Sequence, residues 1–270
     1  MKKALLTAVL IIALVGCATS PTGRRQLMLI SPEQAITQSQ TAYVQQMQAF
    51  DKEGLISEDK ALVDRVNLIT GRLVAQAIEM RPETENWKWS VEVIDDPETV
   101  NAWCMAGGRM AIYTGLIQQT NATDDEIAQV MGHEIAHALA DHTAEKMSIA
   151  MASQLGVIAV GVGTGDNRAM AGAAAAALLA VNLPNSRAAE TEADRIGIEL
   201  AAKAGYHPDA AASLWKKMGE VGGSGPPQFL STHPAPGNRQ ATLAKLAPQM
   251  MPYYQAAKNP PVYPMSPGRY

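Results

Sequence analysis

Cysteine is nearly absent from this 270-residue sequence, which contains only Cys17 and Cys104. Two cysteines allow at most one disulfide, so a small fold stapled by several disulfides is excluded. Aromatic residues are few, at 5%, and basic residues do not outnumber acidic ones, because the formal net charge is −4. That balance argues against nucleic acid as a partner. The length is sufficient for one large domain or two small ones with a real core.

Long hydrophobic runs are also missing. The apolar run Ala4–Val15 follows two lysines and is too short to span a bilayer as a stable helix, which is typical of an export signal. It ends in Leu-Val-Gly-Cys at residues 14–17, which resembles a bacterial lipobox and predicts lipidation of Cys17. An ordinary secretory leader with a chance cysteine is the alternative. Ala18, in place of an aspartate that retains lipoproteins at the inner membrane, favours an outer-membrane anchor facing the periplasm.

The sequence divides into four segments by composition. We expect a signal peptide over residues 1–16 and a polar, lipidated tether over 17–31. A folded domain over 32–247 follows, and the repeated prolines of 248–270 predict an extended or disordered tail. Cys104 lies inside the folded domain, where we interpret it as a small core residue.

Residues 123–142, TDDEIAQVMGHEIAHALADH, predict a helix that carries a metal site. Thr123 and Glu126 form a capping-box pattern at its start. His133 and His137 are four residues apart and therefore lie on one helical face, where both imidazoles can reach one ion. Glu134 is turned about 100° from His133, so it can act on a water without being a ligand. The alternative is a buried helix with two satisfied core histidines.

A second helix, predicted from Ser186 to Gly205, supplies carboxylates. Glu190 and Asp194 lie four residues apart on one face. A catalytic zinc with two histidines needs a third protein ligand and an open position. We assign Glu190 to the third position and Asp194 to orienting a histidine. Glu192 and Glu199 are the control carboxylates on the same helix.

A small antiparallel sheet is predicted immediately before the metal helix. Residues 87–94 alternate apolar and polar, and strand-like runs at 100–106 and 109–114 flank Gly107 and Gly108. An edge strand beside a protease cleft can hold an extended peptide through backbone hydrogen bonds, and the candidate residues are Asn101, Ala102, Gly107 and Gly108. A purely structural hairpin is the equal alternative.

The segment after His142 is apolar without a good transmembrane span. Gln154 interrupts residues 149–163, alanine dominates residues 169–183, and polar residues 166–168 separate them. Packed helices of a soluble domain are the favoured interpretation. A hairpin that is mobile or touches the membrane, covering the active site, is the alternative.

Three motifs in this order resemble metallopeptidase family forty-eight: His-Glu-x-x-His at 133–137, the acidic helix at 186–194, and Thr-His-Pro at 232–234. The hairpin at 101–116 resembles the family's pattern too, although Ala106 stands where relatives often have proline. The family includes Oma-type peptidases, CAAX prenyl proteases and bacterial lipoproteins of the BepA and LoiP type. The resemblance implies an α+β, mostly helical zincin-type (gluzincin) domain with the small sheet beside the active-site helix.

The resemblance also implies roles for individual residues. The ligands of one Zn²⁺ would be His133, His137 and Glu190, with Glu134 as the general base. His233 would be a late histidine near the metal that stabilises the oxyanion. Arg239 would pair with an acidic group at the site.

These inferences together predict a lipid-anchored zinc metalloendopeptidase of the bacterial cell envelope. The resemblance suggests misfolded or unassembled envelope proteins, including outer-membrane barrels, as substrates, and the outer-membrane assembly machinery as a partner. The alternative is a chaperone-like assembly factor with a latent metal site, in which His233 occupies the open zinc position. A metal-binding envelope protein without catalysis is a weaker third hypothesis, because a glutamate stands beside His133.

Overall fold

The structure is a computed structural model, and it describes residues 17–164, 168–169, 171–172, 174, 186–221, 226–234 and 238–265. The chain forms two compact units. The first comprises residues 1–37 and 141–183, and the second comprises residues 38–140 and 184–270. The predicted signal peptide and the alanine-rich stretch fall largely outside the described residues.

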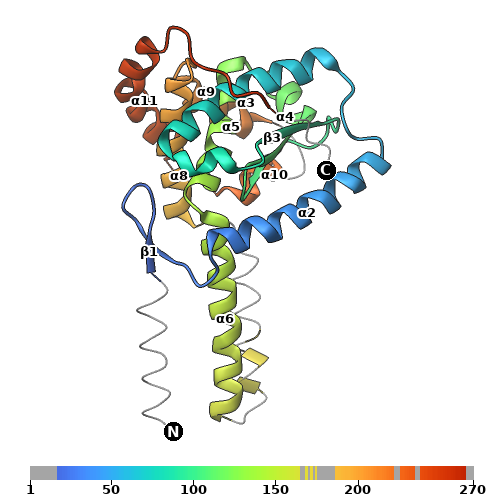
Figure 1. Ribbon diagram of the computed structural model, residues 1–270, viewed down its shortest axis with the longest axis vertical. Coiled ribbons are helices and arrows are strands. Elements are labelled where there is room, and N and C mark those ends of the chain that lie inside the picture. Colours follow the sequence, from blue (N-terminus) through green and yellow to red (C-terminus); the bar gives the residue numbers. More distant parts are fainter. Residues whose placement is uncertain are drawn as a thin grey trace. The chain divides into compact units, whose positions relative to one another are not determined.

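Helices make up most of the second unit (Figure 1). They are the end of α2 (Pro32–Lys52), α3 (Lys60–Met80), η1 (Pro82–Asn86), α4 (Thr114–Gln119), α5 (Asp124–Leu139), α8 (Arg187–Lys203), α9 (Ala210–Glu220), α10 (Gln228–Thr232) and α11 (Arg239–Ala256). The predicted metal helix is α5, which contacts α3, α8, α9 and β4 and is buried along nearly its whole length. It is therefore the central element of this unit.

The three-stranded sheet of the second unit has the order β3-β5-β4, with β3 (Ser90–Ile94), β4 (Ala102–Met105) and β5 (Arg109–Tyr113). Strands β4 and β5 form the predicted antiparallel hairpin, whereas β3 is parallel to β5. The prediction of a wholly antiparallel sheet was therefore wrong for β3. The turn after β3 does reverse the chain, but β5 inserts between β3 and β4 and thus runs in the direction of β3.

The hairpin turn requires its two glycines. Gly107 and Gly108 have φ angles of +88° and +85°, in the left-handed region that side chains disfavour. A Cβ on Gly108 would also lie 2.5 Å from the indole ring of Trp89. The glycine pair is thus explained by turn geometry and close packing.

Glycine also sets the approach of α5 and α8. A Cβ on Gly132 would lie 2.9 Å from the carbonyl oxygen of Gly197, and a Cβ on Gly197 would lie 2.8 Å from the Cα of His133. Only residues without a side chain permit backbones to pack at this distance. The close contact places the acidic helix α8 directly against the histidine helix α5.

Helix α11 extends into the segment predicted as an extended or disordered tail, so that prediction was wrong over residues 248–256. Helix α11 continues through Pro248 and Pro252 to Ala256, anchored by the buried side chains of Ala247 and Met250. Beyond the helix, Tyr263 N–H donates to the carbonyl of Gly71 at 2.9 Å. Burial against the core outweighs the helix-breaking effect of the prolines.

The first unit contains the antiparallel pair β1 (Cys17–Thr19) and β2 (Arg25–Leu27) and the helix α6 (His142–Thr164). The region predicted as a tether therefore has fixed structure. Arg24 forms a two-pronged ion pair with Glu145 of α6, at 2.6 and 2.7 Å. No helix among the described residues is long and apolar enough to cross a membrane.

Candidate metal centre

The two histidines of α5 meet at their outer nitrogens. Thr123 and Glu126 form the predicted capping box, which fixes the start of the helix. Nε2 of His133 lies 3.1 Å from Nε2 of His137, and both rings are buried. One face of α5 therefore presents two ring nitrogens to a single point, as the spacing predicted.

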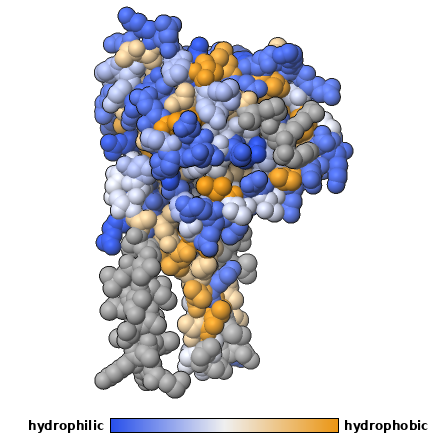
Figure 2. Space-filling model, in the orientation of Figure 1, coloured by the Kyte–Doolittle hydropathy of each residue, from blue (hydrophilic) through white to orange (hydrophobic). Residues whose placement is uncertain are grey.

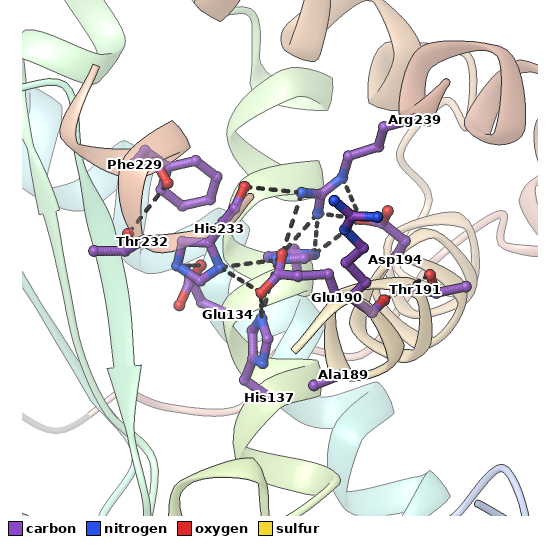
Figure 3. A network of polar contacts seen from close by, with 12 residues as sticks. Glu134, His137, Ala189, Glu190, Thr191, Asp194, Phe229, Thr232, His233 and Arg239 are labelled. Carbon is purple, nitrogen blue, oxygen red and sulfur yellow. Dashed lines mark hydrogen bonds and ion pairs between the residues drawn. The ribbon is translucent and has the colours of Figure 1, made fainter. Parts of the chain in front are cut away.

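Helix α8 brings Glu190 to the same point. The side chain of Ser186 caps the helix by accepting from Ala189 N–H at 3.1 Å. The carboxylate of Glu190 is fully buried and lies 3.3 Å from His133 Nε2 and 3.4 Å from His137 Nε2. In Figure 3 the side chains of His137 and Glu190 point toward one another from their two helices.

Asp194 lies one turn further along α8, behind the histidine. Its Oδ1 is 3.1 Å from Nδ1 of His133. A proton on Nδ1 that is donated to Asp194 fixes the orientation of the His133 ring. This contact is the one that the sequence predicted for Asp194.

Arg239 begins α11 and joins the two carboxylates. Its Nη2 and Nε contact Asp194 Oδ1, the latter at 3.1 Å, and its Nη1 donates to Glu190 Oε2 at 3.2 Å. The guanidinium carbon lies 3.5 Å from the centroid of the Trp215 ring, which supplies an aromatic face beneath the charge. Arg239 is buried and pairs with acidic groups as expected.

His233, at the end of α10, lies inside the cluster rather than beside it. Its Nδ1 is 3.3 Å from His133 Nε2 and 3.2 Å from Glu190 Oε1. Its ring stacks on Phe229 with centroids 4.4 Å apart and an interplanar angle of 19°. One donor atom from each of His133, His137, Glu190 and His233 lies within 4.8 Å of the others.

Glu134 faces His233 from the other side. Burial raises the pKa of Glu134 to about 7, opposed by the nearby His233 and by the backbone N–H of Cys104. Its Oε1 has no hydrogen-bond partner in the described part of the chain, although His233 Nε2 lies 3.4 Å away. A buried carboxylate oxygen without a hydrogen bond is unusual, and a bound water or substrate could supply the missing donor.

The other charges of the cluster are strongly coupled. Burial opposes ionisation of Glu190, but its contacts with the three histidines outweigh burial and hold the pKa of Glu190 far below its usual range. Burial and Arg239 lower the pKa of His133, yet hydrogen bonding to Asp194 and Glu190 leaves that pKa raised. Glu190 is therefore an ionised carboxylate facing three imidazoles.

Comparison with known proteins identifies the family. The family model described as Peptidase family M48 matches residues 65–247. The chain belongs to peptidase family M48. Members of this family are zinc-dependent metallopeptidases.

Relatives of this M48 chain come from mitochondria and from bacteria. It is 32% identical over 254 residues to "Metalloendopeptidase OMA1, mitochondrial" of Bos taurus, covering 89% of this chain and 48% of the relative. It is 28% identical over 226 residues to "Beta-barrel assembly-enhancing protease" of Yersinia pestis, covering 80% of this chain and 44% of the relative. The chain thus spans about half the length of these relatives.

The M48 cluster fits a zinc ion on its donor chemistry. Two imidazole nitrogens and a carboxylate are a frequent donor set of catalytic zinc. Nε2 atoms of His133 and His137 face each other at 3.1 Å, so one cation could contact both when the two nitrogens are unprotonated. The cluster of His133, His137, Glu190 and His233 could therefore hold one metal ion, and the choice of His133, His137 and Glu190 as its ligands stays a prediction.

Four features of the site were missed from sequence. Trp215 and Phe229 support Arg239 and His233, and Gly132 with Gly197 sets the distance between the helices. The aromatics carried a weak signal, because the chain has only four Trp and two Phe. The pair Gly132 and Gly197 carried no signal. Local sequence does not show which helix a glycine packs against, nor how close the two backbones lie.

The predicted substrate-strand residues lie at the edge of the sheet. Asn101 and Ala102 are buried at the start of β4, and the carbonyl of Asn101 accepts from Tyr113 N–H at 3.0 Å. Strand β4 is the last strand in the order β3-β5-β4, and its Cys104 N–H contributes to the environment of Glu134. The edge position is as predicted, and substrate binding there remains a prediction. Cys17 belongs to the other unit, in β1.

Proposed function

We propose that this chain is a lipid-anchored zinc-dependent metalloendopeptidase of the bacterial cell envelope. One observation carries the peptidase part of the proposal: donor atoms of His133, His137 and Glu190 converge in a buried cluster, and the buried carboxylate of Glu134 lies beside them. One oxygen of that carboxylate makes no hydrogen bond in the described part of the chain, which a purely structural site would not need.

The residues divide the chemistry among them. When bound, zinc would polarise the scissile carbonyl and make water more acidic. Glu134 would take a proton from the attacking water and deliver it to the leaving amine, for which a pKa of about 7 is well suited. A His233 N–H would donate a hydrogen bond to the developing oxyanion. Asp194 and Arg239 would hold His133 and Glu190 in their orientations.

An extended segment of an unfolded protein is the substrate that we assign to this site. Strand β4 is a sheet edge whose neighbour α5 carries the catalytic groups, so an added strand would pair through its backbone regardless of sequence. The similarity to proteins named beta-barrel assembly-enhancing protease supports unassembled outer-membrane proteins as the physiological class and the outer-membrane assembly machinery as a partner.

For the cellular location we propose lipidation of Cys17 and an outer-membrane anchor that faces the periplasm. The lipobox-like residues 14–17 and Ala18 support this location. The OMA1 relatives are mitochondrial, whereas the relatives from Yersinia pestis and Vibrio cholerae are bacterial. The lipobox favours the bacterial setting.

Cleavage of unfolded casein tests the enzymatic proposal. Purified protein with zinc should cleave casein, and both a zinc chelator and Glu134→Gln should abolish cleavage. Glu199→Gln is the matched control, because Glu199 lies on α8 in a partly exposed pair with Lys203 and should leave cleavage unchanged. Cleavage by Glu134→Gln at the wild-type rate would refute the assigned mechanism.

A chaperone-like assembly factor with a latent site is the second candidate, and the position of His233 favours it. Nδ1 of His233 lies as close to the donors as the donors lie to one another, so His233 is placed to take the fourth zinc position and exclude water. In that case His233→Ala would increase casein cleavage. If His233 stabilises the oxyanion, the same change would reduce cleavage about 10²–10³-fold.

A further inference from the structure

Helix α6 of the first unit exposes an apolar surface that the peptidase chemistry does not use. Its side chains of Ile149, Leu155 and Ile158 are 40%, 49% and 61% exposed. They are half of the six large hydrophobic side chains that are exposed among the described residues. The prediction of packed helices over residues 149–183 stays a prediction, because much of its second half lies outside the described residues. Figure 2 shows apolar residues along the visible face of this helix.

The exposed side chains lie on opposite sides of the helix. Ile149 and Ile158 are nine residues apart, which is about two and a half turns and therefore half a turn out of phase. No charged residue occurs between Lys146 and Asp166. A groove on a protein partner covers one face of a helix, whereas lipid acyl chains can surround it. The all-round exposure thus favours a bilayer as the occupant.

The polar end of α6 is tied to the segment that carries the predicted lipid anchor. Glu145 pairs with Arg24 at 2.6 and 2.7 Å and accepts from the side-chain amide of Gln26 at 2.9 Å. Ile30 N–H donates to Ser148 Oγ at 2.9 Å. Strands β1 and β2 pair Cys17 with Leu27, so Cys17 is joined by backbone hydrogen bonds to the segment bound to α6.

We propose that residues 149–164 of α6 enter the hydrocarbon of the bilayer to which Cys17 is attached. The inference rests on the lipid anchor given under Proposed function and goes beyond it, because it assigns a second membrane contact. This contact requires only that α6 enter the bilayer from the side of the anchor. The charged turn with Glu145 and Lys146 stays at the headgroups, where Lys and Glu are solvated. One lipid and one apolar helix together meet the two-signal requirement for stable anchoring.

A fluorophore sensitive to its surroundings, attached at Ile158→Cys, tests this contact. The full-length protein also carries Cys104→Ala, so that residue 158 holds the only reactive thiol when Cys17 is lipidated. If mass analysis shows that Cys17 carries no lipid, Cys17→Ser is added to remove its thiol. The protein is mixed with phosphatidylethanolamine–phosphatidylglycerol vesicles, with or without doxyl-labelled acyl chains. Lys216→Cys is the matched control, because Lys216 is 69% exposed on α9 of the second unit.

On adding vesicles, the probe at residue 158 should shift to shorter wavelength, lose most of its emission to the doxyl lipid and become shielded from aqueous iodide. The probe at residue 216 should do none of these. Equal iodide access at both sites in vesicles would overturn the proposal. Shielding of residue 158 without vesicles that increases with protein concentration would also overturn it, in favour of a second copy of the chain. Mass analysis reports Cys17 lipidation, and casein cleavage by the same samples reports the peptidase separately.

Discussion

Gly197 of α8 lies so close to His133 of α5 that a methyl group on Gly197 would be 2.8 Å from the His133 Cα. The two helices that supply the proposed zinc ligands therefore meet backbone to backbone. Because Glu190 and Asp194 are on the same helix as Gly197, this approach fixes their distance from both ring nitrogens of His133. The metal centre depends on a packing contact as much as on its ligands.

Gly197→Ala should impair the metal site more than the fold. The added methyl would meet backbone atoms of α5 at 2.8 Å, so α8 must move away from α5, at a cost of about 1–3 kcal/mol in the free energy of unfolding. Zinc affinity, measured by competition with a chromogenic chelator, should fall at least tenfold. Gly219→Ala on α9 is the control, since a Cβ there meets nothing within 4 Å. Equal zinc affinity in the two variants would contradict the prediction.

Arg239→Lys should weaken zinc binding although it keeps the charge. The guanidinium contacts Asp194 and Glu190 at once and lies over the ring of Trp215, which an ammonium cannot reproduce. Loss of groups that orient ligands costs about 10–100-fold in metal affinity. Isothermal titration with zinc checks this, and Arg195→Lys, at an exposed position on α8, should titrate like wild type.

Phe229→Leu should change catalysis in the same direction as His233→Ala, because Phe229 stacks on the His233 ring. Zinc content should stay at one per chain, because Phe229 offers no ligand atom and its contacts with His133 and His233 are ring contacts only. Phe50→Leu changes the only other phenylalanine, which packs against Tyr113, and should leave casein cleavage unchanged. Both changes cost about 1–2 kcal/mol of stability. A parallel loss of cleavage in both would show a general packing effect.

Glu126→Gln should remove stability that depends on pH. Burial raises the pKa of Glu126, but Lys217 at 2.7 Å, the Thr123 N–H and Ser213 outweigh it, so the folded pKa is lowered. A carboxylate whose pKa is lower in the folded state stabilises the fold at pH values above its unfolded-state pKa of about 4.3. This stabilisation is lost as the pH falls through the folded-state pKa.

At pH 7 the Glu126→Gln variant should therefore be about 2 kcal/mol less stable than wild type in urea unfolding with chelator present. The difference should narrow as pH falls below about 4.3. Asp124→Asn, which breaks a surface pair with Arg65, should cost less than about 1 kcal/mol. A difference for Glu126→Gln that is constant from pH 7 to pH 3 would contradict the assignment of the charge.

Much of the site could be predicted because its signals are local. His133 and His137 at helical spacing, and Glu190 with Asp194 on a capped helix, each define one face of one element. The structure brings these faces together, and it adds His233 and Arg239 from segments that the family pattern located. Helix α5 itself was predicted within a few residues, since its capping box and apolar stripe agree.

What failed depends on contacts between distant segments. The parallel pairing of β3 arises because β5 inserts between two strands that the chain visits consecutively. Helix α11 passes through Pro248 and Pro252 because Ala247 and Met250 are buried against the core. The exposure of Ile158 on α6 was missed for a similar reason, because an apolar run alone does not reveal whether protein or lipid covers it.

X-ray absorption at the zinc edge tests the central claim most directly. Purified wild-type protein should hold one zinc per chain with nitrogen and oxygen neighbours only, and Glu199→Gln should give the same spectrum. Glu190→Gln should lose most of the metal, because it removes the carboxylate charge from the cluster. Absence of zinc from folded wild type, full retention by Glu190→Gln, or a sulfur neighbour from Cys104 would contradict the account.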